Sequence, residues 1–363
     1  MKTNVDLILN GQAQGAMADK LVNGGLNINR MKPFIAEDGN AYVTVFKGGD
    51  PKKPENYSVA PVNNATLRRD EWKTLDDAVM GVARYRLGGV QDLIDKGLTY
   101  NLGNPFGTTV LEWHDVSDSM EAALTMDGIT RSSGDRPNFK HNYLPIPIIH
   151  VDYEINARVL AASRSMGNPL DTTSAESAAR RVIEKLENML FTDTTYSFGT
   201  KDERLRNTIY SYVNFPDRNL VNLSIDWDGS GITGALILQD VLEMKQASIN
   251  AYHYGPWMLY IPTGYETVLD GDYDSTTPGT TIRERILKIA GIQGIKVVDT
   301  LAANNVLLVQ MTPNVVRLVR GTGLQNIQWG EEGNMVTKYK VMTIQVPQIR
   351  SDQNGHTGIV HLA

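Results

Sequence analysis

Hydrophobic side chains recur at helical spacing in two long stretches of the chain. Residues 67–96 place apolar side chains at three- and four-residue steps and acidic side chains near their start, which predicts a helix. Gly88 and Gly89 interrupt this stretch and predict a bend or a break, and Gly97 predicts its end. Residues 171–191 carry a second apolar stripe at the same spacing, which predicts a long amphipathic helix. The members of this second stripe are Ala175, Ala178, Ala179, Val182, Ile183, Leu186, Met189 and Leu190.

The start and the polar side of the second helix also follow from the sequence. Thr173 and Glu176 have the spacing of a capping box, in which each side chain binds a backbone N–H of the other's residue. Glu176 and Arg180, and likewise Arg180 and Glu184, are spaced to form ion pairs on the exposed side. We therefore expect a stiff helix around which the rest of the chain is organised.

Alternation of polar and apolar residues predicts the strands. Pro145 and Pro147 alternate with apolar residues, and because proline has no N–H donor this segment is expected to be an extended lead-in or an edge strand. Residues 150–156 alternate as in a half-buried strand, which is expected to end at a turn over 166–169. Residues 126–143 are charged and rich in turn-forming residues, which indicates a long hairpin with a charged tip. Further strands are expected at 41–46, 108–115, 122–126 and 339–346.

Two further regions flank this frame. Residues 1–65 are rich in glycine, asparagine and proline and are expected to form an extended arm that orders against another surface, including a neighbouring chain. Helices and strands alternate from about 217 to 320, which indicates a second compact unit of α/β or α+β type, and residues 335–363 are β-rich. The expected helices of the second unit are at 232–249 and 281–290, with a short one between them, and its expected strands are at 257–262, 295–300, 306–311 and 315–320.

The composition narrows the function. A length of 363 residues favours two domains, or one domain with long extensions, and 41% hydrophobic residues suffice for a core. The net charge of −6 argues against a dedicated nucleic-acid binder, which would be basic. The absence of cysteine excludes disulfides and thiolate metal sites and fits a chain made in a reducing cytosol. The sequence holds no apolar run of membrane-spanning length, and no apolar core follows its first residues as in a signal peptide.

The motifs that could carry catalysis or nucleotide binding are each incomplete. Gly229, Gly231 and Gly234 match the spacing of a dinucleotide-binding loop, but the strand that follows does not end in the acidic residue that would bind the ribose. The same region begins like a calcium loop, yet its twelfth position is Ile237 instead of the required glutamate. The sequence holds no G-x-S-x-G, Walker A or H-E-x-x-H motif.

Three groups of acidic and histidine side chains could bind a metal ion in principle. The side chains of the first group, at 150–154, would share one face of a strand. The second group, at 114–118, lacks a fixed third ligand, and the third group, at 270–274, forms an acidic loop. For each group a solvated or interface surface is the favoured interpretation. The groups are His150 with Asp152 and Glu154, His114 with Asp115 and Asp118, and Asp270 with Asp272 and Asp274. We therefore expect no enzyme activity, no cofactor and no metal site.

The order of the elements, together with five stretches of sequence, resembles the major capsid proteins of tailed phages with the Hong Kong 97 fold, a fold shared by encapsulin shells. The stretches are residues 64–72, 144–153, 164–171, 178–182 and 187–191. The likeness covers about residues 60–363 and implies an α+β fold. The implied regions are an N-terminal arm at 1–66, an N-terminal helix region at 67–97, an E-loop hairpin at 98–143, a P-domain at 144–216 with its spine helix at 171–191, an A-domain at 217–320, and P-domain C-terminal strands at 321–363.

The resemblance also implies a function and partners. The chain would be a structural major capsid subunit that assembles as hexamers and pentamers into an icosahedral shell around phage double-stranded DNA, in a virion assembled in the host cytoplasm. Its partners would be other copies of itself, a portal, decoration proteins and in some cases a scaffold, and double-stranded DNA packaged without sequence specificity, but no membrane. The candidates for contacts between subunits are Arg131, Asp135, Arg136, Lys140, Asp270, Asp272 and Asp274.

The sequence allows three alternatives to this interpretation. Lys140 lies in the region where some members of the phage family form a covalent crosslink between subunits. The favoured interpretation is that Lys140 is a plain surface lysine without such a crosslink. An encapsulin-type nanocompartment that houses an enzyme cargo would share the fold. Residues 1–65 favour the phage interpretation, because encapsulins usually start near the first long helix. A nucleotide-dependent enzyme built on the Gly229 region is the third hypothesis.

Overall fold

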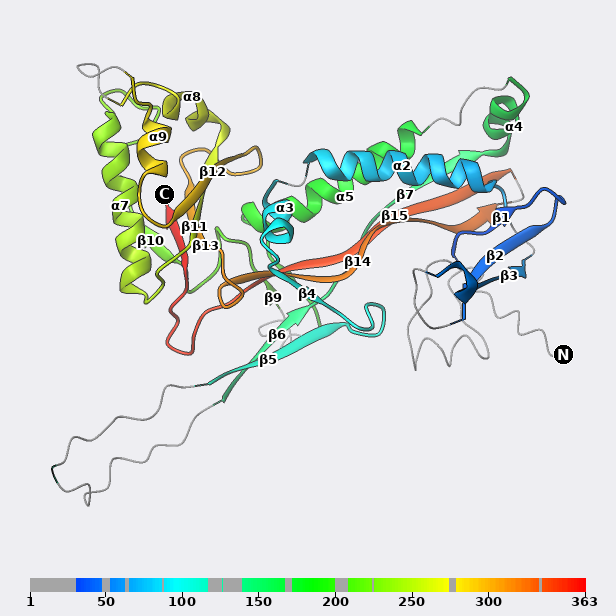
Figure 1. Ribbon diagram of the computed structural model, residues 1–363, viewed down its shortest axis with the longest axis horizontal. Helices are drawn as coiled ribbons and strands as arrows, with labels where there is room; N and C mark the ends of the chain where they lie inside the picture. The colour runs from blue at the N-terminus through cyan, green and yellow to red at the C-terminus, as the bar shows by residue number, and fades with distance from the viewer. Residues whose placement is uncertain are drawn as a thin grey trace.

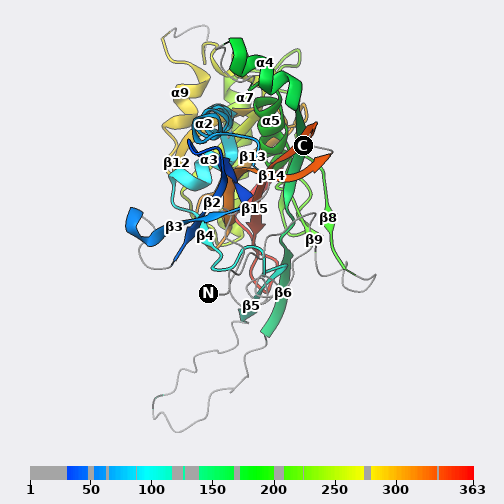
Figure 2. The same cartoon turned by 90° about the vertical axis from the view of Figure 1, so that its right-hand side faces the viewer.

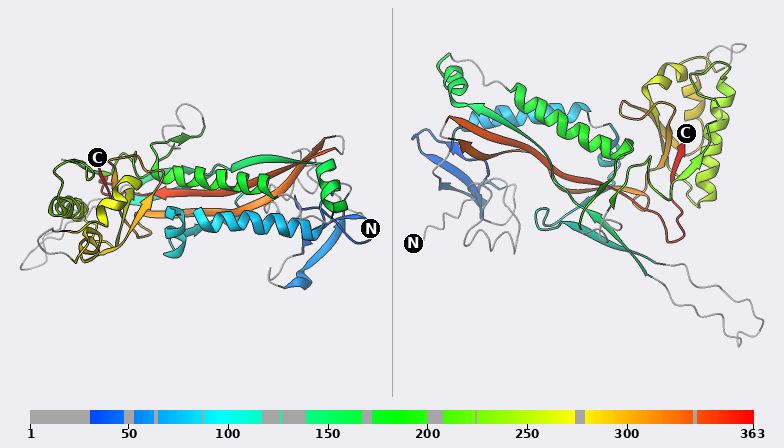
Figure 3. Two further views of the ribbon diagram at one scale, coloured as in Figure 1. Left: turned by 90° about the horizontal axis from the view of Figure 1, so that it is seen from above. Right: turned by 180° about the vertical axis from the view of Figure 1, so that it is seen from behind.

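The computed structural model describes residues 31–47, 53–62, 65–86, 88–116, 126, 139–166, 172–199, 208–223, 225–273, 279–332 and 335–363, and the elements given below are those of this part of the chain. The molecule is long and consists of two units (Figure 1 and Figure 3). The first unit is a twisted sheet covered by two long helices, and the second unit lies at one end of it. A small N-terminal sheet lies at the opposite end, and a two-stranded hairpin projects from the first unit (Figure 2).

The first unit is built on a four-stranded sheet with the order β4-β14-β15-β7. Its central strands, β14 (Val316–Glu332) and β15 (Val336–Ile349), pair antiparallel along nearly their full length. β7 (Ile149–Asn156) pairs antiparallel with β15 at one edge, and β4 (Thr99–Asn101) pairs parallel with β14 at the other. Exposed side chains alternate with more buried ones along β7, as predicted, because only one face of this strand meets the core.

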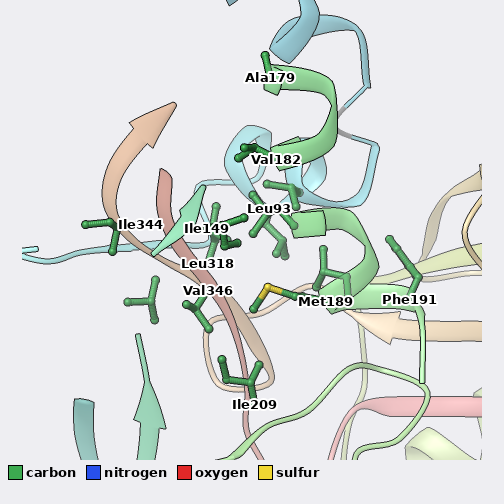
Figure 4. Packing of buried hydrophobic residues seen from close by; sticks show 14 of the residues in the cluster. Leu93, Ile149, Ala179, Val182, Met189, Phe191, Ile209, Leu318, Ile344 and Val346 are labelled. Carbon is green, nitrogen blue, oxygen red and sulfur yellow. The ribbon is translucent and has the colours of Figure 1, made fainter. Parts of the chain in front are cut away.

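Two long helices, α2 (Arg69–Arg86) and α5 (Thr173–Phe191), lie on one face of this sheet. Every apolar position predicted for the stripe of α5 is buried, and all of these side chains except Ile183 share one core with the sheet (Figure 4). α2 ends at its last arginine and α3 (Gly88–Asp95) begins two residues later, so the predicted break is confirmed. Gly97 closes this region with a φ of 69°, a conformation that glycine adopts without strain.

The start of α5 differs from the prediction. Thr172, not Thr173, is the N-cap residue, and its hydroxyl donates to Glu176 Oε1 at 2.7 Å, so the predicted capping box does not form. The glutamate comes one position too late in the helix to bind the N-cap backbone N–H. On the exposed side, an ion pair joins Arg181 and Glu184 at 3.1 Å instead of the two predicted pairs.

The helix α4 (Ala157–Met166), which follows β7 directly, was not predicted from the sequence. Among its described side chains only Leu160 is buried, so the segment has no apolar stripe that the pattern could reveal. The Arg164 guanidinium instead ties this helix to α2 through Glu71, at 2.7 Å. The strand at 150–156 therefore ends at a helix and not at the predicted turn.

The second unit contains a five-stranded mixed sheet with the order β10-β16-β13-β11-β12. Two helices, α7 (Gly234–Asn250) and α9 (Ile282–Leu287), pack on it, and η3 (Thr263–Tyr265) and α8 (Glu266–Leu269) follow β11. The alternation of helices and strands predicted for this region is confirmed in these elements. The strands are β10 (Asn219–Val221), β11 (Trp257–Pro262), β12 (Ile292–Val298), β13 (Val306–Gln310) and β16 (Ile359–Leu362).

Two strands near the end of the chain differ from the expectation. β14 continues to Glu332, well past the strand predicted at 315–320, and it pairs with β4 and β15 in the first unit, so the expectation that this strand belongs to the second unit is wrong. β16 lies between β10 and β13 in the second unit, so the expectation that all of 321–363 belongs with the long helix is wrong for this strand. Every residue of β16 is buried, and a strand covered on both faces carries no alternation that would assign it to one sheet.

The remaining described elements are small sheets. The N-terminal sheet contains the strand predicted at 41–46, and Pro147 lies between the hairpin and β7, in the predicted extended lead-in. The strand expected at 122–126 and the hairpin tip lie outside the described residues, apart from residue 126. The elements are β1 (Phe34–Ile35), β2 (Ala41–Phe46), η2 (Pro54–Asn56) and β3 (Tyr57–Pro61) in the N-terminal sheet, β5 (Val110–Val116) and β6 (Phe139–Pro145) in the hairpin, and the short pair β8 (Tyr196–Ser197) and β9 (Thr208–Ile209).

Candidate assembly surfaces

The β5–β6 hairpin offers one free face. The two strands pair antiparallel, with Trp113 opposite Asn142 and Glu112 opposite Tyr143. Because side chains alternate along a strand, Trp113 and Asp115 are half-buried against the body while Glu112 is exposed. Within the described chain no third strand pairs with either of them. A two-stranded sheet is marginal when it stands alone, so the exposed face of this hairpin is a candidate contact surface.

A cavity of about 350 Å3 lies beneath the base of the hairpin, between β6, the segment 208–217 and the end of β15. The Asp115 carboxylate accepts a hydrogen bond from Asn142 and pairs with Arg350 at 3.6 Å. Two buried donors on lining residues, Trp113 Nε1 and Arg350 Nε, have no hydrogen-bond partner within the described chain. A cavity of this size and polarity has room for water, which would satisfy both donors.

The predicted hairpin contacts fall only partly within the structure. Lys140 is exposed on β6, lines the cavity and stands opposite Asp115 in the strand pair. Arg131, Asp135 and Arg136, at the predicted tip, lie outside the described residues. The structure therefore places Lys140 at the base of the hairpin and leaves its role as a contact between subunits a prediction.

The predicted acidic loop belongs to another part of the molecule. Asp270 accepts a hydrogen bond from Arg283 Nε at 2.6 Å, and Asp272 forms an isolated antiparallel bridge with Thr281. Asp274 lies outside the described residues. These contacts bind the two ends of the loop to each other, next to α8 and α9, far from the hairpin (Figure 1). The structure does not bring the two sets of candidate contacts together.

The motifs considered for catalysis have local structural roles. Thr233 is the N-cap residue of α7, where its hydroxyl accepts from Leu236 N, and a Cβ at Gly234 would lie 2.6 Å from Tyr273 O. Close packing therefore accounts for this glycine. Asp152 on β7 pairs with Lys340 at 3.4 Å. Among the described residues, no three or more His, Asp or Glu side chains are grouped so that they could hold a metal ion.

A buried polar cluster, which was not predicted from the sequence, lies where α3 and α5 meet the sheet of the second unit. Glu187 Oε1 accepts a hydrogen bond from Gly89 N at 2.7 Å, at the start of α3. Asp92, on the same short helix, accepts from the Tyr260 hydroxyl at 3.0 Å and from Lys296 Nζ. Glu187 is 8% exposed and Asp92 4% exposed, so both carboxylates are removed from water. We call these five residues the polar joint.

Burial dominates the electrostatics of the polar joint. It raises the pKa of Glu187 above its ordinary value, an effect that the backbone N–H donors oppose and the nearby Asp92 reinforces. Burial likewise raises the pKa of Tyr260.

One feature of the sequence could have predicted the cluster: Glu187 stands four residues after Ile183 and three before Leu190, on the apolar stripe of α5. An acidic residue in such a position requires a buried partner.

Comparisons with known proteins cover most of the chain. A family model described as "Family of unknown function (DUF6260)" matches residues 62–362. The type 1 encapsulin shell protein EncA of Myxococcus xanthus (strain DK1622) is 23% identical over 278 residues, which cover 75% of this chain and 83% of that protein.

Two solved structures are similar in fold. The virus-like particle from Pyrococcus furiosus has a TM-score of 0.56 at 18% identity, over 80% of this chain and 99% of that one. The capsid of Myoviridae phage XM1 has a TM-score of 0.58 at 9% identity, over 76% of this chain and 91% of that one. At such identities the similarity concerns the fold alone. Within the described chain, no helix has the length and apolar character needed to cross a membrane.

Proposed function

Since this chain belongs to the family of unknown function DUF6260 and has the α+β Hong Kong 97-like fold, we propose that it is the structural subunit of a self-assembling protein shell. The observation that carries the proposal is the β5–β6 hairpin, which projects from the first unit with one face exposed. The Phe139 side chain on β6 is 59% exposed, so the hairpin presents apolar as well as polar groups to a neighbour. Contact with an adjacent copy would supply the support that a two-stranded sheet lacks.

A shell also suits the rest of the molecule. The N-terminal sheet and the second unit lie at opposite ends of a long body, so one subunit can reach neighbours on several sides (Figure 1). Many modest contacts repeated by symmetry hold a closed assembly together without any one strong interface. In this proposal 98–143 is the E-loop, 171–191 the spine helix of the P-domain, and most of 217–320 the A-domain.

The finer proposal is a phage major capsid protein. The chain would form hexamers and pentamers of an icosahedral shell around double-stranded DNA, with a portal, a scaffold and decoration proteins as further partners. The net charge of −6 supports this, because packaged DNA is confined rather than bound, and a basic lining would hinder its entry. A described N-terminal sheet, β1–β3, precedes the matched residues 62–362, as expected for a capsid subunit with an added arm.

A second candidate is the shell of an encapsulin-type compartment that houses an enzyme. The similarity to EncA favours it, since the aligned residues cover 83% of that encapsulin shell protein. Particles isolated from cells that carry the gene would separate the two candidates by their contents. Double-stranded DNA supports the capsid, and a single abundant protein cargo supports the compartment.

Electron microscopy of the chain expressed alone tests the coarser proposal. We expect hollow particles much larger than a subunit, and Phe139→Asp should prevent their formation while the subunit keeps its far-UV circular dichroism. Met80→Asp is the matched control, because Met80 on α2 is also partly exposed (45%) but lies on the body away from the hairpin. A wild-type chain that stays monomeric at high protein concentration and high salt would overturn the proposal. Normal particles from Phe139→Asp would remove the hairpin's role in it.

A further inference from the structure

His114 and His141 stand directly opposite each other on the exposed face of the β5–β6 hairpin. The strand register pairs the two residues, and their imidazole rings lie edge to face with centroids 4.3 Å apart at 85°. Both residues are exposed, so the ring contact does not fill a core. In the sequence, His114 is grouped with its chain neighbours Asp115 and Asp118, whereas the folded hairpin supplies a different partner from across the sheet.

The two imidazoles differ from the other histidines in having no polar partner. Within the described chain, no hydrogen bond and no ion pair involves His114 or His141. The other four histidines each have such a partner. These are His150 with Asp152, His253 with Gln310, His356 with Asp352, and His361 with Arg218 and Asn305. The ring nitrogens of the hairpin pair are therefore available to a ligand, at a place where two of them meet.

We propose that His114 and His141 form a two-imidazole binding site for a divalent transition-metal ion such as Zn2+. Imidazole nitrogen is the protein ligand most often used for such ions, and it binds zinc at about 2.0–2.1 Å. Residues directly opposite on neighbouring strands have Cβ atoms about 5 Å apart, so rotation of the two rings brings one nitrogen of each to a shared metal position. Water completes the coordination, because no third side chain converges there among the described residues.

A bound ion would link the two strands of a sheet that has no third strand. Metal binding that requires the folded arrangement of its ligands stabilises that arrangement. Glu112 lies on the same exposed face, two residues before His114, and adds a negative charge that favours a cation at the pair. The site would thus stabilise the β5–β6 strand pair, whether the assembled shell contains DNA, a protein cargo or neither.

Zinc titration of the purified, untagged protein tests the site, with zinc chloride as the probe and calorimetry as the readout. We expect one zinc ion per chain, and His114→Gln and His141→Gln should each weaken binding roughly tenfold or more, because each removes one of two chelating ligands. His150→Gln is the matched control, since His150 is also an exposed strand histidine and shares its strand face with two carboxylates, Asp152 and Glu154. It should leave the affinity unchanged.

Hydrogen exchange followed by mass spectrometry provides a second, local readout. Zinc should slow amide exchange in Val110–Val116 and Phe139–Pro145 of the wild type, and it should have no effect there in His114→Gln. Circular dichroism of each variant shows whether it is folded. Zinc binding that is equal in the wild type and in the His114→Gln/His141→Gln double variant overturns the proposal. Loss of binding in His150→Gln with retention in the hairpin variants overturns it as well.

Discussion

Replacement of Gly89 by alanine tests how tightly the polar joint is packed. A Cβ at this position would lie 2.3 Å from Cε2 and 2.5 Å from Cζ of Phe191, well inside normal carbon contact at about 3.5 Å. The Phe191 ring is 1% exposed and packs against the rings of Tyr212 and Tyr260, with centroids 5.6 and 5.0 Å away. The ring could withdraw only by displacing these neighbouring side chains.

The expected cost follows from these contacts. Insertion of a methyl group into a well-packed core lowers the free energy of unfolding by about 1–3 kcal/mol. The higher helix propensity of alanine offsets about 0.5–1 kcal/mol of this loss. A shift of α3 away from Phe191 would also lengthen the 2.7 Å hydrogen bond from Gly89 N to Glu187. We therefore expect Gly89→Ala to lower the free energy of unfolding by about 1–2 kcal/mol.

Urea unfolding monitored by circular dichroism measures this change at equal protein concentration. Gly81→Ala is the matched control, because Gly81 lies in α2 with no atom within 4 Å of the added Cβ. It should raise the free energy of unfolding by about 0.5–1 kcal/mol. If Gly89→Ala proves as stable as Gly81→Ala, the close packing between α3 and Phe191 does not exist in solution.

Two further predictions concern pH and the core. Burial, together with the charge of Arg218, lowers the pKa of His361 to about 4, while the unfolded chain titrates near the ordinary value of 6.5. The unfolded state therefore binds the proton first, and His361 should cost the fold roughly 3 kcal/mol of stability as the pH falls from 6.5 to 4. His361→Gln should remove this part of the pH dependence, which is measured as the difference in the free energy of unfolding in urea between wild type and variant at each pH. If the free energy of unfolding changes with pH equally in both proteins, the prediction is wrong. Leu186→Asp, on the buried stripe of α5, should abolish soluble native protein, because an unpaired buried charge costs several kcal/mol. Lys185→Asp, on the exposed neighbour, should remain soluble, and a native circular dichroism spectrum from Leu186→Asp would refute the burial of that stripe.

The sequence predicts the frame of this fold well because the frame depends on periodic burial. The predicted stripe of α5 is buried at every position, and the break between α2 and α3 falls where Gly88 and Gly89 were expected to produce it. The α+β Hong Kong 97-like fold predicted from the order of elements is confirmed. Local hydrogen bonding is less predictable: a shift of the cap from Thr173 to Thr172 moves Glu176 out of the capping position.

Other features could not be predicted from the sequence because they have no periodic pattern of apolar residues. α4 is tied to α2 by the ion pair of Arg164 with Glu71 and has a single buried described side chain, so its sequence resembles a loop. β16 is buried on both faces, and only the three-dimensional pairing assigns it to the second unit. The pairing of His114 with His141 depends on the register of a hairpin whose connection is long, and loop length does not fix register at that distance.

The polar joint illustrates what a pattern of residue types leaves out. In the sequence, Glu187 is an acidic residue at an otherwise apolar position of the stripe of α5, and Asp92 is one polar residue of a short helix. Each becomes stable only in the presence of groups far away in sequence: the backbone of Gly89 for the first, Tyr260 and Lys296 for the second. Loss of one partner would leave a buried charge uncompensated, which costs more than the paired arrangement gains. The joint therefore permits only those positions of the second unit relative to α5 that keep all its hydrogen bonds, a constraint that apolar packing alone would not impose.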